Sequence, residues 1–208
     1  MNAPDSPRQD SDAFISDEEL LLRYTQGETG AFETLVRRYR RELFGFLARF
    51  VGDRALAEDV FQEAFLQVHL SAGGFDVSRR LKPWLFTIAA NKARDALRSR
   101  SRRSAAQLDA EIGDEDGARF VDLLASKVQR PDERIKNLET AEIVRKVVRG
   151  MPEPLRMVLV LCYFHDFAYK EIAAILGIPL GTVKSRLHVA VKDFARRWTA
   201  AYGTSRHE

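Results

Sequence analysis

Apolar side chains recur at the helical period along most of the chain. A short run follows residue 16, and longer runs cover 31–50, 54–70, 83–103, 132–149, 153–164 and 169–176 and extend from 180 to about 198. Recurrence every three or four positions places the apolar residues on one side of a helix. No stretch stands out for the alternation of a half-buried strand. The pattern predicts an all-α protein.

Breaks in this pattern divide the chain into two small helical modules. Residues 1–15 form a polar lead that we expect to be disordered, and 16–103 form the first module. Residues 104–131 are an acidic linker with little periodicity, and 132–200 form the second module. Ser16 with Glu19 is a capping box that starts the first helix. Pro83 suits the first position of the fourth helix, where its missing N–H costs nothing.

Residues 169–198 have the pattern of two helices joined by a tight turn. Gly177 suits the left-handed C-cap of the first helix, and Pro179 prevents that helix from continuing. The second helix has an apolar stripe that includes Val183, Leu187 and Val191. Its opposite face has no acid and carries Gly181, Lys184, Ser185, His188 and Lys192. A helix-turn-helix places such a face in the DNA major groove. An ordinary helical hairpin with a solvated basic face is the alternative, and the turn favours DNA.

Charge is unevenly distributed although the net charge is only +3. Residues 79–103 contain nine Lys or Arg and one acid, whereas 109–124 contain six acids and one arginine. Such asymmetry indicates nucleic acid at the basic part. One side of the predicted fourth helix combines Trp84 with Asn91, Arg94 and Arg98, a combination that stacks on bases and binds phosphates. A tryptophan at a helix start is more often a core residue, but the basic surroundings favour stacking here.

The predicted third helix has a mixed surface. Leu66 and Leu70 lie among Asp59, Gln62 and Glu63, which indicates either a protein-binding surface or packing on a neighbouring helix. Asp59 and Glu63 share a face at i, i+4, so a metal-dependent nuclease is an alternative. We rank it far lower, because the sequence offers no paired carboxylates at metal-site spacing and no His/Cys cluster. No cofactor or metal is expected.

Other features bear on compartment. Cys162 lies in an apolar run and is expected to be a buried structural thiol. No apolar run approaches the ~20 residues that span a bilayer, so no membrane insertion is expected. The amino-terminal residues lack the apolar region of a signal peptide. A cytoplasmic protein is expected.

The order of the two modules resembles the extracytoplasmic-function group of bacterial sigma factors, in the sigma-70 family. The resemblance rests on AEDVFQEAFLQVH and PWLFTIAANKARD in the first module and on YKEIAAILGIPLGTVKSRL in the second. It implies a dissociable, non-catalytic subunit of RNA polymerase that recognises promoters. It also implies binding to the polymerase clamp helices and flap, and control by an anti-sigma factor.

The resemblance assigns site residues in three groups. Polymerase binding falls on Asp59, Gln62, Glu63 and Leu66. Recognition of the melted −10 element falls on Phe75, Asp76, Ser78, Arg79, Arg80, Trp84, Asn91, Arg94 and Arg98. Recognition of the −35 duplex falls on Thr182, Lys184, Ser185, Arg186, His188 and Lys192. The loop after Phe75 departs from the small polar step that is usual in the family, so no −10 base preference is carried over.

A stand-alone helix-turn-helix regulator is the other reading of the second module. It leaves the basic helix of the first module unexplained. Tight, sequence-specific binding to duplex DNA without polymerase would favour it.

Overall fold

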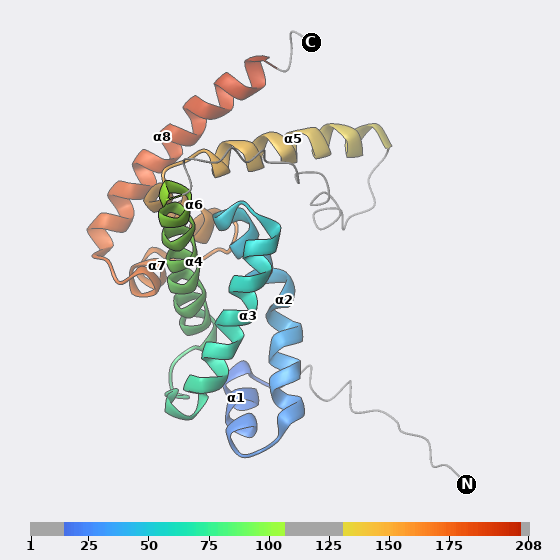
Figure 1. The fold of residues 1–208 in the computed structure, drawn as a ribbon, viewed down its shortest axis with the longest axis vertical. Helices are drawn as coiled ribbons and strands as arrows, with labels where there is room; N and C mark the ends of the chain where they lie inside the picture. The colour runs from blue at the N-terminus through green and yellow to red at the C-terminus, as the bar shows by residue number, and fades with distance from the viewer. Residues whose placement is uncertain (1–14, 107–130, 205–208) are drawn as a thin grey trace.

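The computed structural model describes residues 15–106 and 131–204, and within them the fold is entirely helical (Figure 1). This confirms the all-α prediction. The predicted amino-terminal lead and most of the predicted linker lie outside the described residues. The elements are α1 (Asp17–Thr25), α2 (Thr29–Val51), α3 (Arg54–Ser71), the short 3-10 helix η2 (Ala72–Gly74), α4 (Leu81–Ala106), α5 (Pro131–Arg149), α6 (Glu153–Tyr163), α7 (Tyr169–Leu176) and α8 (Leu180–Thr204).

The first module is built around α2. Leu43, Phe46, Leu47 and Phe50 of this helix are fully buried, and α1, α3 and α4 pack against it. Gly52 ends α2 with a φ of 77°, a left-handed conformation in which a side chain would be strained. Ser16 caps α1 as predicted, because its Oγ accepts the Glu19 N–H at 3.1 Å. The Glu19 carboxylate accepts from Arg23 Nε at 2.9 Å, so the reciprocal bond of the predicted capping box stays a prediction.

Helix α4 begins two residues before the position predicted from Pro83. The backbone N–H of Leu81 donates to Oε1 of Glu18 in α1 at 2.7 Å. A carboxylate 63 residues away in sequence thus satisfies a free N–H at the start of the helix. Pro83 lies inside the first turn, where a missing N–H is harmless. The local pattern could not indicate a partner supplied by another helix.

The second module is built around α6, whose Val158, Val160 and Leu161 are fully buried. Helices α7 and α8 pack against α6, and α5 packs along α8 (Figure 1). The predicted inclusion of Val191 in the apolar stripe of α8 is wrong, because 42% of this residue is exposed. The buried side of α8 runs instead through Val183, Leu187 and Ala190.

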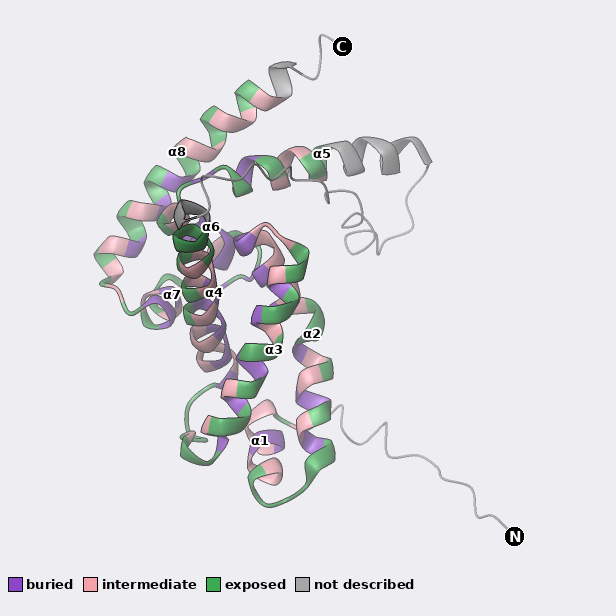
Figure 2. Ribbon diagram, viewed as in Figure 1, coloured by how far each residue is buried: buried purple, intermediate pink, exposed green. Residues whose placement is uncertain are grey.

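The two modules pack directly against each other, which the sequence pattern did not predict. His165, in the loop between α6 and α7, is buried between the two modules. Its ring lies 5.7 Å from that of Phe46 and 5.4 Å from that of Phe86. Phe167 lies 4.8 Å from Phe86, edge to face. We call these four residues the inter-module aromatic contact. Its three phenylalanines belong to a buried hydrophobic cluster with members in both modules, and Figure 2 shows buried positions on helices of both.

A charged group borders this contact. Lys82 Nζ lies 2.6 Å from Oε1 of Glu42, and Nδ1 of His165 lies 3.6 Å from the same oxygen. Burial by itself raises the pKa of the Glu42 carboxyl, but His165 and Lys82 more than offset it, so the pKa lies below its ordinary value. The carboxylate therefore stays ionised at the edge of the module interface.

No helix in the described ranges is both long enough and apolar enough to cross a bilayer.

We expect Glu18→Ala to lower the free energy of unfolding by about 1–2 kcal/mol, because it leaves the Leu81 N–H without its acceptor. Urea denaturation should show a lower midpoint at an unchanged slope. Glu33→Ala is the matched control, since Glu33 is exposed on α2. Equal midpoints for the two variants would show that the contact contributes nothing.

We expect the stabilising effect of Glu42 to depend on pH. A carboxyl whose pKa is lowered by folding stabilises above its unfolded pKa of about 4.3, and this stabilisation is lost as the pH falls through the folded value. The difference in unfolding free energy between the wild-type chain and Glu42→Gln should be greatest near pH 7 and shrink below about pH 4.3. Glu33→Gln should show no such trend. A difference that is constant with pH for Glu42→Gln contradicts this account.

Candidate nucleic-acid interface

The turn between α7 and α8 exposes the polar face of α8. Gly177 adopts a φ of 63°, so α7 ends in the predicted left-handed cap. The carbonyl oxygen of Pro179 then accepts the N–H groups of Thr182 (2.9 Å) and Val183 (3.1 Å), which starts α8. Val183 and Leu187 anchor the inner side of the helix in the core.

Four of the six residues predicted for the −35 element are exposed on α8: Lys184, Ser185, His188 and Lys192. Thr182 and Arg186 are half-buried. Within the described residues, the side chains of Lys184, His188 and Lys192 make no ion pair or hydrogen bond. The first acid along α8, Asp193, is already paired with Arg196 and Arg197. The face therefore offers uncompensated positive charge to a ligand.

The loop before α4 has a defined structure. Asp76 Oδ1 accepts both the backbone N–H of Ser78 (3.0 Å) and its hydroxyl (2.7 Å), which closes a local turn. These hydrogen bonds lower the pKa of the Asp76 carboxyl. The turn leaves Arg79 and Arg80 exposed. Arg80 Nη1 lies 2.8 Å from Oε1 of Glu171 in α7, so this residue of the first module is paired with the second.

Trp84 is half-buried, and its ring centroid lies 4.7 Å from that of Phe75. The pair packs against the core of the first module. Part of the indole surface is thus used for packing. This fits in part the alternative considered for Trp84, that a tryptophan at the start of a helix is a core residue. Its stacking on a base stays a prediction.

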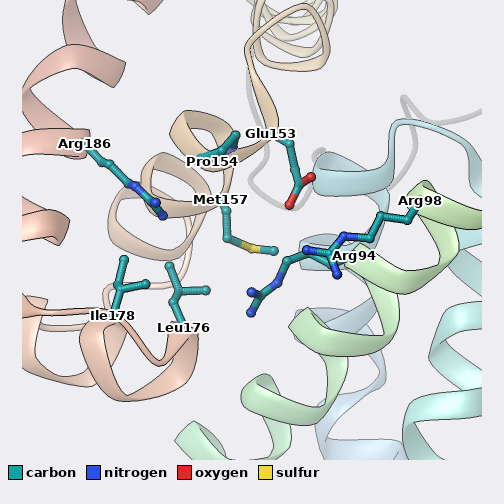
Figure 3. Close-up of a pocket in the computed structure, with 8 residues that line it drawn as sticks. All are labelled: Arg94, Arg98, Glu153, Pro154, Met157, Leu176, Ile178 and Arg186. Atoms are coloured by element: carbon teal, nitrogen blue, oxygen red, sulfur yellow. The ribbon is translucent and has the colours of Figure 1, made fainter. Parts of the chain in front are cut away.

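The basic face of α4 carries the remaining −10 candidates. Asn91 is exposed and its Oδ1 accepts Nη2 of Arg94 at 3.1 Å. Arg98 is exposed and lies 3.8 Å from Asp95. Arg94 and Arg98 line a cavity of about 240 Å³ together with Arg186 of α8 (Figure 3). The structure thus brings candidates from the −10 and −35 groups to one site.

The candidates for polymerase binding are exposed on one helix. Asp59, Gln62, Glu63 and Leu66 are all exposed on α3, and Leu66 and Leu70 have 58% and 68% of their surface accessible. The two leucines therefore do not pack on a neighbouring helix in this arrangement. Among the described residues, no group of three His, Cys, Asp or Glu side chains could hold a metal ion, so nothing completes a metal site at Asp59 and Glu63.

Sequence reasoning missed several residues that connect the modules. Glu171 caps the Ala168 N–H at 2.9 Å, a pattern visible in the sequence, but its pairing with Arg80 is not. Arg156 is buried, with its guanidinium 5.1 Å from the Phe50 ring centre and Nη1 donating to the Arg149 carbonyl at 2.8 Å. No local signal distinguishes these side chains from solvated ones.

Cys162 is half-buried, so the prediction of a fully buried thiol is wrong. Burial and the nearby Asp166 raise the pKa of the Cys162 thiol, which disfavours the reactive thiolate.

Comparison with known proteins gives two family matches. The profile of sigma-70 region 2 matches residues 35–103, and that of sigma-70 region 4 matches residues 141–194. The RNA polymerase sigma-H factor of Pseudomonas aeruginosa is 33% identical over 172 residues, covering 82% of this chain and 88% of the relative. The ECF RNA polymerase sigma factor SigW of Bacillus subtilis is 31% identical over 163 residues, covering 78% and 86%.

Two solved structures share the fold. The sigma factor RpoE in complex with the anti-sigma factor NepR, from Bartonella quintana, gives a TM-score of 0.61 at 21% identity and covers 83% of this chain and 96% of that one. CnrH in complex with the cytosolic domain of CnrY gives 0.62 at 24% identity, covering 89% and 99%. The profiles, the relatives and the fold agree. The chain belongs to the sigma-70 family of RNA polymerase sigma factors and, within it, to the extracytoplasmic-function group.

Proposed function

We propose that this chain binds core RNA polymerase through α3 and recognises promoters with two separate surfaces. The α8 face with Lys184, Ser185 and His188 contacts the −35 duplex. The loop at Phe75 and the basic face of α4 hold the melted −10 strand. The family consists of transcription initiation factors without enzymatic activity. The free energy for promoter recognition and strand opening therefore comes from binding alone.

The unpaired polar face of α8 is the observation that carries this proposal. A helix whose exposed face carries the free side chains of Lys184, His188 and Lys192, preceded by a tight turn, has the shape and charge that the major groove accepts. On α4, Arg94 stands beside the amide of Asn91, and the same helix carries Trp84 and Arg98, a set of residues that suits a single strand. Flipping a base from the stack costs a few kcal/mol, which stacking and base-edge hydrogen bonds offset.

Reconstituted transcription tests the proposal. Purified chain added to core polymerase should stimulate initiation on genomic fragments, and the stimulated start sites should share upstream elements. Free chain should show little specific affinity for the same duplex. Stimulation of no genomic promoter would overturn the proposal.

The modules must separate when a promoter is bound. Elements at −10 and −35 lie about 25 base pairs apart, which is roughly 85 Å at 3.4 Å per base pair. In the free chain, however, Arg98 and Arg186 line one cavity, and Arg80 is paired with Glu171. The closed arrangement cannot present both surfaces to one promoter at once. Polymerase binding therefore has to hold the modules apart.

We also propose control by an anti-sigma protein and a cytoplasmic location. The support for control is that RpoE and CnrH, whose fold this chain shares, are bound to NepR and to the cytosolic domain of CnrY in their structures. The location follows from the proposed work on chromosomal DNA.

If Lys184 makes a base contact, Lys184→Ala is expected to weaken binding of the holoenzyme to promoters that have a −35 element. The expected loss is about 1–3 kcal/mol, a factor of roughly 5 to 150 in affinity. Open-complex formation at several salt concentrations measures the effect. Lys146→Ala, an exposed lysine on α5, is the control. An equal loss on promoters without a −35 match would show that the contact is not specific to bases.

Leu66→Ser is expected to weaken binding to core polymerase by about 1–2 kcal/mol, roughly 5- to 30-fold, because it removes exposed apolar surface at the centre of the α3 candidates. Fluorescence titration with core enzyme measures this affinity. Val191→Ser serves as the control, since Val191 is an exposed valine of the other module. An unchanged affinity for Leu66→Ser would remove α3 from the proposed polymerase surface.

A further inference from the structure

The cavity between the modules has a composition that suits an anion. Arg94 and Arg98 enter it from α4, and Arg186 enters from α8, with Glu153 as the single acid among the lining residues. Figure 3 shows the α4 arginines extending toward α6 and α7 from one side, and Arg186 reaching in from the other. Like charges brought together across an interface repel, so the closed arrangement carries an electrostatic cost at this point.

Little within the described chain offsets this cost. Arg186 makes no hydrogen bond or ion pair there. Arg94 bonds through Nε to the Ala90 carbonyl (3.3 Å) and through Nη2 to Asn91 (3.1 Å), both neutral acceptors on its own helix. Arg98 approaches Asp95 only to 3.8 Å at an exposed position. Such surface pairs contribute little. The guanidinium groups thus remain available to a phosphate, which they can bind through two parallel N–H donors each.

The rest of the lining is apolar. An apolar wall completes the lining beside Arg186 and consists of Pro154, Met157, Leu176 and Ile178 (Figure 3). Met157 and Leu176 belong to the buried core, so this wall is fixed in place. At about 240 Å³ the cavity is somewhat smaller than the pockets of about 300–1,000 Å³ that hold drug-sized ligands. It suits a small molecule that is anionic at one end and apolar or planar at the other.

We propose that this cavity binds the phosphate end of a small organic phosphate with at least two negative charges, such as a nucleoside diphosphate, which bridges α4 and α8. The phosphates contact Arg94, Arg98 and Arg186, and the rest of the molecule lies against Ile178, which is only half-buried. Binding stabilises the closed arrangement and withholds these arginines from DNA. The binding step is independent of the proposed function; only its effect on transcription depends on it.

Calorimetric titration of the full chain with ADP tests the site, with pyrophosphate as a second probe. ADP is expected to bind at a single site. Arg98→Ala and Arg186→Ala, one from each module, should each weaken it roughly tenfold or more, as loss of a charged hydrogen bond does. Arg102→Ala is the matched control, because Arg102 is exposed one turn further along α4 and does not line the cavity.

Two further variants separate charge from shape. Glu153→Gln removes the opposing acid and should tighten both ADP and pyrophosphate. Ile178→Ala shortens the apolar wall and should weaken ADP but leave pyrophosphate unchanged.

Several results would overturn the proposal. One is the absence of saturable binding at millimolar ADP. Another is a loss of ADP affinity in only one of Arg98→Ala and Arg186→Ala, and a third is an equal loss of affinity in Arg102→Ala. Tighter binding of a short single-stranded oligonucleotide than of ADP through the same arginines would assign the cavity to DNA instead. Failure of reconstituted transcription would leave the binding result intact, so the two proposals fail separately.

Discussion

The position of Phe86 is the constraint on which the arrangement of the molecule depends. Its fully buried ring contacts Phe46 within its own module, at 5.3 Å, and His165 and Phe167 of the other. One side of α4 is thereby committed to the core that both modules share. The helix packs against α7, and Arg94 and Arg98 of its basic side line a cavity with Arg186 of α8. The pairing of Arg80 with Glu171 and the cavity at Arg186 both follow from this orientation of one helix.

His165 makes this shared core weaker than an entirely apolar one would be. Both of its ring nitrogens are buried, and within the described chain the nearest acceptor given for either, Oε1 of Glu42, lies 3.6 Å from Nδ1, too far for a good hydrogen bond. Leaving a buried polar group unsatisfied costs about 1–3 kcal/mol. The contact therefore joins large aromatic surfaces with a polar residue that limits their net attraction. Such a balance suits the separation of the modules that we propose for the promoter-bound state.

Local structure followed from the sequence where its cause was local. The cap at Ser16, the left-handed Gly177 and the buried side of α8 up to Leu187 depend on residues within two turns of each other, and each agrees with the structure. The start of α4 and the charge environment of its basic segment did not follow. Glu18, Glu42, Asp53 and Glu171 supply partners for this segment from other helices. The count of nine cations against one acid therefore overstates the charge left for DNA, and only the tertiary fold determines which arginines remain free. The assignment of individual residues to bases needs the DNA itself.

The packing of the loop at His165 against the first module has a consequence for solubility. While the modules are closed, Phe46 and Phe86 are covered. Withdrawal of the loop would remove the cover that His165 and Phe167 give to these rings. An opened chain without polymerase would thus expose a contiguous apolar patch of the kind that leads to aggregation. The closed arrangement keeps this apolar surface covered.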